Sequence, residues 1–150
     1  MILRHRTVAT VPRSPGAAAG QRALTGTTLS ASAGVSQFGV HIVELHPGAQ
    51  SSDRHWHERE DEFLLVLAGQ ATVLDNDGAH LLAPGYAACW PAGVADGHHE
   101  RNLSDQPCRY LIVGWRTPDD LVDYSDIDRV YTCAADGQAS RTRQDGTPLR

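Results

Sequence analysis

The residues best suited to chemistry in this 150-residue sequence are histidines and carboxylates between positions 55 and 100. His55 and His57 are two residues apart, so on a strand both imidazoles leave the same face, roughly 6.5 to 7 Å apart along the backbone. Glu62 follows a polar segment, where a turn could return its carboxylate to the same place. Two imidazoles and a carboxylate converging on one point are suitable ligands for a transition metal ion.

A second histidine pair, His98 and His99, offers a third imidazole. Adjacent residues of an extended chain face opposite sides, so at most one of the two is expected to join a site formed by His55 and His57. Such a site suits Fe, Mn, Ni, Cu or Zn and leaves coordination positions open to water or a substrate. Imidazole pairs also occur on ordinary protein surfaces, so a solvated loop is the alternative interpretation.

Two further carboxylates are candidates for roles beside such a metal. Strand alternation places Glu100 on the same face as His98, either as a general base or as a partner of a ligand. A carboxylate exposed at the rim is the alternative for Glu100. Asp61 would replace Glu62 as a ligand if the register shifted by one residue, but a solvated turn residue is the more common role for such an acid.

The elements that must position these residues are predicted to be β-strands. From about residue 36 the sequence consists of short apolar runs separated by turn residues, which is typical of an all-β sandwich or barrel. Asn76-Asp77-Gly78 predicts a tight turn between two antiparallel strands. Only the segment 118–131 is ambiguous, because a proline followed by acidic residues also resembles a helix start. We expect a flexible arm at 1–28, one barrel domain at 29–137 and a C-terminal tail at 138–150.

Composition narrows the class of protein. With 41% hydrophobic and 21% charged residues, the chain has the balance of a globular domain and not that of a collagen, a coiled coil or a disordered chain. A formal charge of −5 and the absence of lysine make nucleic acid an unsuitable partner. No apolar run approaches the roughly 20 residues needed to cross a bilayer, and no signal segment is recognisable, so we expect a soluble cytoplasmic protein. Cys89, Cys108 and Cys133 lack Cys-x-x-Cys spacing and predict buried free thiols.

Considered together, the two histidine stretches resemble the two sequence motifs of the cupin superfamily of small β-barrels. The first motif, which contains His-x-His and a glutamate between two glycines, is matched by Gly48, His55, His57, Glu62 and Gly69. The second is matched by Gly85, Pro91, Gly93, His98 and Asn102. Four residues separate Gly93 from His98 instead of the two in the simplest pattern, so this loop is longer. The His-x-x-x-Asn spacing selects His98 over His99.

The resemblance covers about residues 36–116 and implies the fold and the ligands. The implied fold is a single-domain all-β cupin barrel, a double-stranded β-helix or jelly roll. The implied cofactor is one divalent transition metal ion, such as Fe, Zn, Ni or Mn, held by residues that point into the barrel: His55, His57, Glu62 and His98. Asn102 is expected to support a loop. If alternation holds, the cavity lining includes Leu64, Val66, Tyr110 and Ile112.

The function implied by the resemblance is that of a metal-dependent enzyme acting on a small organic molecule. A dioxygenase-type reaction is expected ahead of isomerisation, lyase chemistry or natural-product tailoring. The alternative is a binding or sensor protein that uses the metal to hold a small ligand without converting it. We also expect a homodimer, because strand edges and apolar rim residues are commonly covered by a second copy.

Overall fold

The computed structural model describes residues 10–11 and 24–149, and in this part of the chain the regular structure is almost entirely β-strand. The first elements are β1 (Thr10–Val11), β2 (Leu24–Thr28), the 3-10 turn η3 (Ala31–Ala33), β3 (Phe38–Leu45), β4 (Trp56–His57), β5 (Glu62–Ala68) and β6 (Ala71–Asp75). They are followed by β7 (Gly78–Leu82), β8 (Ala87–Trp90), β9 (His99–Arg101), β10 (Cys108–Trp115), β11 (Leu121–Tyr124), β12 (Arg129–Cys133) and β13 (Ala139–Thr142). The expected all-β fold is confirmed.

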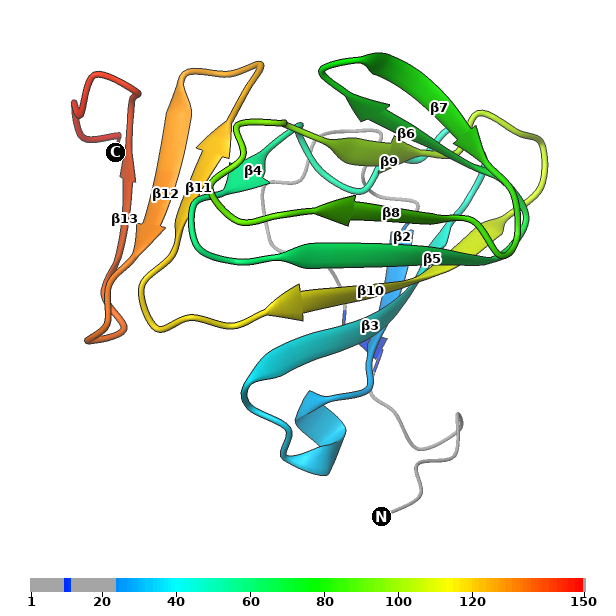
Figure 1. Cartoon of the computed structure of the whole chain (residues 1–150), viewed down its shortest axis with the longest axis horizontal. Helices are drawn as coiled ribbons and strands as arrows, with labels where there is room; N and C mark the ends of the chain where they lie inside the picture. Colours follow the sequence, from blue (N-terminus) through cyan, green and yellow to red (C-terminus); the bar gives the residue numbers. More distant parts are fainter. Residues whose placement is uncertain (1–9, 12–23, 150) are drawn as a thin grey trace.

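The strands form three antiparallel sheets (Figure 1). The largest has the order β1-β2-β3-β10-β5-β8, and the others have the orders β13-β12-β11-β4 and β7-β6-β9. Isolated bridges from Gln50 to Arg101 and from His55 to His98 connect the loop before β4 to the region of β9. Strands that are distant in the sequence therefore surround a common interior.

The core lies between these sheets and follows from alternation along the strands. On β5, Leu64 and Val66 are fully buried, and β10 contributes Tyr110 beside them in register with Val66. Gly69 ends β5 with φ of 73°, and a Cβ atom there would lie 2.5 Å from the carbonyl oxygen of Pro107. Only glycine allows the two backbones to approach this closely.

The predicted hairpin at residues 76–78 is confirmed. Strands β6 and β7 pair from Ala71 with Leu82 to Asp75 with Gly78, and Asn76 and Asp77 form the turn. The Asp75 carboxylate accepts hydrogen bonds from the backbone N–H groups of Asp77 and Gly78, at 2.9 and 3.1 Å. This side chain therefore satisfies the turn's own backbone donors.

Three expectations about the ends of the domain need correction or completion. The arm expected at 1–28 contains β2, which pairs with β3 along its whole length, so the sheet begins before residue 29; residues 1–9 and 12–23 lie outside the described part. The tail expected at 138–150 contains β13, which pairs with β12. The ambiguous segment 118–131 contains β11 and most of β12, which form an antiparallel hairpin and no helix.

Candidate metal centre

Four side chains from separate elements converge in the interior. His55 and His98 face each other across an antiparallel bridge, His57 belongs to β4, and Glu62 is the first residue of β5. The ring centroid of His55 lies 5.2 Å from that of His57 and 5.5 Å from that of His98. Glu62 Oε2 lies 3.0 Å from His98 Nε2 and 3.7 Å from His57 Nε2. Ligand atoms of His55, His57 and Glu62 all lie within 4.8 Å of one another.

The opposite nitrogen of each imidazole is held by an oxygen atom. His55 Nδ1 lies 3.0 Å from the carbonyl oxygen of Asp53, and His98 Nδ1 lies 3.1 Å from that of Asp96. His57 Nδ1 lies 2.6 Å from the Asp120 carboxylate. Because these oxygens only accept, each Nδ1 donates its hydrogen. When the ring is neutral, Nε2 therefore keeps a lone pair for an ion.

The donor atoms of these four side chains suit a divalent metal ion. Three neutral imidazoles and one carboxylate are the ligands that first-row transition metals accept, and the outer hydrogen bonds fix the required tautomer. The residues present therefore fit a metal ion held by His55, His57, Glu62 and His98.

The pKa shifts of the side chains in the cluster are compatible with metal binding. Burial lowers the pKa of His55 to about 4, so this ring is neutral at pH 7. Burial alone would raise the pKa of Glu62, but the hydrogen bond from His98 and the nearby imidazoles outweigh it and lower the pKa. Burial likewise opposes the charged form of His98, while the Glu62 carboxylate raises its pKa overall. The carboxylate and the imidazole thus stabilise each other's charged forms.

Asp120 is a candidate site residue that the sequence did not indicate. Its side chain is almost fully buried just before β11, where Oδ2 accepts from His57 and Oδ1 accepts from the Arg59 backbone N–H at 3.0 Å. Glu60 Oε2 lies 4.0 Å from the same His57 nitrogen. The pairing of β11 with β4, Val122 opposite His57, brings Asp120 to this place from 63 residues away.

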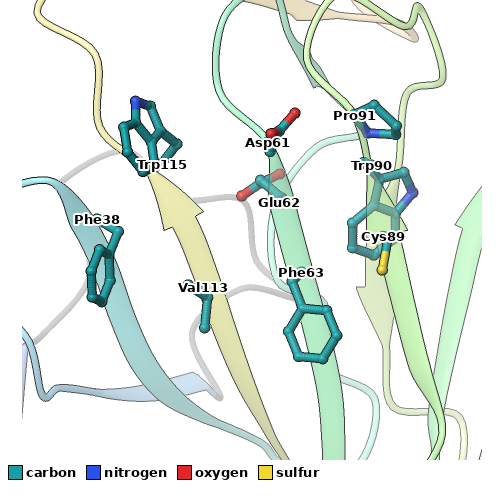
Figure 2. Close-up of a pocket in the computed structure, with 9 residues that line it drawn as sticks. All are labelled: Phe38, Asp61, Glu62, Phe63, Cys89, Trp90, Pro91, Val113 and Trp115. Carbon is teal, nitrogen blue, oxygen red and sulfur yellow. The ribbon is translucent and has the colours of Figure 1, made fainter.

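Trp90 is a second residue whose role the sequence did not reveal. Its ring stacks on the His98 imidazole at a centroid distance of 3.7 Å and an interplanar angle of 7°. Trp90 is also the register partner of Glu62 in the pairing of β5 with β8 (Figure 2). The indole therefore covers one side of the cluster and fixes the plane of the His98 ring.

A cavity of about 210 Å³ adjoins the cluster, and His55, Glu62 and His98 are among its lining residues. Glu100 lines the same cavity and is only 3% exposed, so the rim position considered for it is wrong. The Tyr110 hydroxyl donates a hydrogen bond to Glu100 Oε2 at 3.2 Å. Burial raises the pKa of Glu100 and raises that of Tyr110 well above its usual value. The cavity therefore contains a buried acid pair beside the candidate ligands.

The remaining predicted residues can be placed as well. Asp61 lies outside the cluster and accepts a hydrogen bond from the backbone N–H of Ala92. His99 Nδ1 lies 2.9 Å from the carbonyl oxygen of Ser52, and His99 Nε2 is buried without a hydrogen-bond partner. Asn102 donates hydrogen bonds to the carbonyl oxygens of Leu45 and Gln106, which fits loop support. Tyr110 and Ile112 line the cavity, whereas Leu64 and Val66 are buried in the core.

The cysteine expectation is only partly met. All three cysteines are free, but only Cys108 is fully buried; Cys133 is half-buried and Cys89 is exposed. In the described part of the chain, no helix is both long and apolar enough to cross a membrane.

The fold and the site together define a jelly-roll β-barrel with a candidate metal centre in its interior, and comparison with known proteins gives its family. The cupin domain family matches residues 41–114. A crystal structure described as a sugar phosphate isomerase of the cupin superfamily from Silicibacter pomeroyi DSS-3 is 37% identical, with a TM-score of 0.90 over 100% of this chain and 97% of that one. This chain belongs to the cupin superfamily.

Other solved structures share the fold. A putative sugar phosphate isomerase from Acidithiobacillus ferrooxidans is 23% identical, with a TM-score of 0.76 over 86% of this chain and 83% of that one. A polyketide cyclase from Streptomyces resistomycificus is 27% identical, with a TM-score of 0.67 over 85% and 87% of the two chains. No curated protein has significant sequence similarity to this chain.

Proposed function

We propose that this protein is a metal-dependent isomerase that moves a proton between neighbouring atoms of a small hydroxycarbonyl compound. The observation that carries the proposal is the buried pair of Glu100 and Tyr110 on the wall of the cavity that His98 and Glu62 also line. Isomerisation needs a group that takes a proton from carbon and returns it nearby. The solved structure with 37% identity is itself described as a sugar phosphate isomerase, which supports the same class of reaction.

His55, His57, Glu62 and His98 would hold the divalent ion, which would supply Lewis acidity toward a substrate carbonyl. The Glu100 carboxylate would take the proton from the carbon next to that carbonyl and return it to the carbonyl carbon, while the proton of the neighbouring hydroxyl moves to the former carbonyl oxygen. The two proton shifts conserve all atoms, so no further reactant is consumed. Burial raises the pKa of Glu100, which makes its carboxylate a stronger base. The Tyr110 hydroxyl holds the carboxylate in place through its hydrogen bond.

The volume and the lining of the cavity limit the size and the charge of the substrate. A volume of about 210 Å³ lies below the roughly 300–1,000 Å³ of typical ligand pockets. Within the described residues its lining includes no arginine, and Leu24, Val43 and Ile112 make part of it apolar. We therefore expect a small uncharged hydroxycarbonyl compound, and a phosphorylated sugar would need its phosphate to lie outside this cavity.

The experiment measures proton exchange directly. Protein stripped with a chelator is loaded separately with Zn²⁺, Mn²⁺, Fe²⁺ or Ni²⁺ and incubated in D₂O with short aldoses and ketoses, with and without phosphate groups. Proton NMR then follows isomerisation and deuterium uptake next to the carbonyl. We expect exchange that requires metal. Glu100→Gln should reduce it by about 10²- to 10⁴-fold, the usual contribution of a general base, while metal content is kept.

The matched control is Glu58→Gln, which makes the same change at an exposed glutamate and should leave the exchange rate unaltered. Exchange that persists in Glu100→Gln would contradict the assignment of the base, and no exchange in any loaded form would contradict the isomerase. The dioxygenase reaction expected from the sequence stays a prediction. It predicts oxygen uptake in step with substrate loss in the Fe²⁺ form, measured with an oxygen electrode on the same samples.

A further inference from the structure

Two of the candidate ligands, His55 and His98, are joined by an isolated backbone bridge. The N–H of each residue donates to the carbonyl oxygen of the other, at 3.2 Å for His55 and 3.0 Å for His98. A hydrogen bond contributes only about 0.5–1.5 kcal/mol net, so two such bonds hold the segments less firmly than a full ladder does. The spacing of these two imidazoles therefore depends on further support from side chains.

The Arg54 side chain provides such support, because it stands next to one ligand and binds the residue before the other. Its Nε–H donates to the Gly97 carbonyl oxygen at 3.0 Å. Arg54 thus connects the neighbour of His55 with the neighbour of His98. Only 18% of the Arg54 side chain is exposed, which limits competition from water for this bond.

The other two nitrogens of the Arg54 guanidinium bind two further segments. Nη1 donates to the Asp126 carboxylate at 3.0 Å, in the turn after β11, and Nη2 donates to Asn76 Oδ1 at 2.6 Å, in the β6–β7 hairpin. Asn76 itself donates to the Ala95 carbonyl oxygen and, through its backbone N–H, to the Asp96 carboxylate. Three acceptors in separate segments suit the rigid fork of an arginine and not the compact ammonium of a lysine.

The loop that Arg54 holds is the one that is longer than in the simplest form of the second sequence motif. This loop contributes to a ligand directly, since the Asp96 carbonyl oxygen accepts from His98 Nδ1 at 3.1 Å. On its other side the loop touches the turn between β11 and β12, where a Cβ atom at Gly97 would overlap Ser125 Oγ. The loop is therefore held between the Arg54 guanidinium and this turn, with the Asp96 carbonyl directed at His98.

We propose that Arg54 is a positioning residue that sets the spacing and orientation of His55 and His98 for metal binding. Its hydrogen bonds go to the loop, the hairpin and the turn, so it acts on the ligands through the backbone that carries them. The proposal rests on the metal centre and not on the proposed isomerisation, because its tests use a metal ion alone.

The first test measures affinity for Co²⁺ in competition with a fluorescent chelator. Arg54→Ala should bind Co²⁺ about 10-fold more weakly than wild type, at the lower end of the 10- to 100-fold loss found for groups that contact a ligand directly. Arg54→Lys should lose nearly as much, because its ammonium cannot reach all three acceptors. The matched control is Arg143→Ala, which removes another arginine bonded to an aspartate, Asp128, but lies beyond β13 and should bind as wild type.

The second test separates positioning from a general loss of stability. The visible absorption spectrum of bound Co²⁺ depends on how its ligands are arranged. Arg54→Ala saturated with Co²⁺ should therefore show shifted bands, whereas saturated Arg143→Ala should show the wild-type spectrum. Circular dichroism and urea unfolding without metal check that each variant is folded. If Arg54→Ala does not fold, Arg54→Lys serves for the same comparison, because it keeps a positive charge beside Asp126.

The outcomes separate this proposal from the metal centre on which it rests. Wild-type affinity and an unchanged spectrum in Arg54→Ala would overturn the proposal, because the bridge alone would then hold the two ligands. Wild-type affinity in Arg54→Lys would overturn it too, since a positive charge would then suffice. A wild-type chain that binds no Co²⁺ would refute the metal centre itself and this proposal with it.

Discussion

Asp120→Asn should weaken metal binding although Asp120 is expected to touch no metal. The Asp120 carboxylate has two separate partners, the Arg59 backbone N–H at 3.0 Å on Oδ1 and the His57 Nδ1–H at 2.6 Å on Oδ2. In the asparagine variant the remaining oxygen faces the Arg59 donor, and the amide NH₂ then faces His57. An NH₂ group only donates, so His57 must switch its hydrogen from Nδ1 to Nε2. The nitrogen intended for the ion then has no lone pair.

The expected magnitude follows from the value of such outer hydrogen bonds. Removing the partner of a ligating histidine costs about 10- to 100-fold in metal affinity, which corresponds to about 1.4 to 2.8 kcal/mol. We expect the loss of metal affinity in Asp120→Asn to lie at the upper end of this range. The Asp120 side chain is only 6% exposed, so water cannot easily replace the carboxylate. Asp120→Ala should lose less than Asp120→Asn, because it imposes no wrong donor on His57.

The assay is competition for Zn²⁺ or Co²⁺ against a fluorescent chelator at pH 7.5. Asp119→Asn is the matched control, because the neighbouring side chain is about half exposed and contacts the Arg59 guanidinium and not His57. The reasoning is refuted if Asp120→Asn binds metal as tightly as wild type. It is also refuted if Asp119→Asn and Asp120→Asn lose affinity equally.

The remaining predictions concern the ligands and the loop that supports them. His55→Ala should lower the metal content measured by plasma mass spectrometry, whereas His99→Ala should not, because its ring is directed to the carbonyl oxygen of Ser52. Metal affinity should fall as the pH drops below about 7, since protons compete for imidazole nitrogen. Burial lowers the pKa of His98, but the Glu62 carboxylate outweighs burial and raises it overall, which strengthens proton competition at this ligand. Calorimetric titrations at pH 6, 7 and 8 would contradict this prediction if the affinity were constant. Asn102→Ala should destabilise the fold by about 2 kcal/mol in urea unfolding, because the buried hydrogen bond to the Leu45 carbonyl is lost and the Gln106 carbonyl keeps only the Ser104 hydroxyl as a side-chain donor.

Much of the site could be predicted because its ligands follow local rules. The two-residue spacing of His55 and His57 placed both imidazoles together, and the turn before β5 returned Glu62 to them as expected. The pairing of His98 with His55 across a bridge could not be derived from spacing, and only the motif resemblance selected His98. The placement of His55, His57 and Glu62 therefore needed no knowledge of distant parts of the chain, whereas that of His98 did.

Asp120 could not be predicted because its role depends on a distant pairing. Several acids lie between residues 119 and 128, and nothing in their spacing distinguishes the one that reaches His57. The pairing of β11 with β4 determines which of these acids reaches His57. The segments of β2 and β13 were missed for another reason. Their sequences, LTGTT and ASRT, contain few apolar residues, and their order comes from backbone hydrogen bonds to β3 and β12.

The sequences of β5 and β10 place apolar residues on both faces of their sheet. EFLLVLA and CRYLIVGW are nearly continuous apolar runs, and such runs are typical of strands buried on both sides. Their inward positions supply the barrel interior, including Glu62, while the next residue, Phe63, belongs to the outer face. Because β5 is paired on one side with β10 and on the other with β8, its backbone is fixed by both ladders. Substitutions at outward positions such as Phe63 should therefore leave Glu62 in place on the inner face.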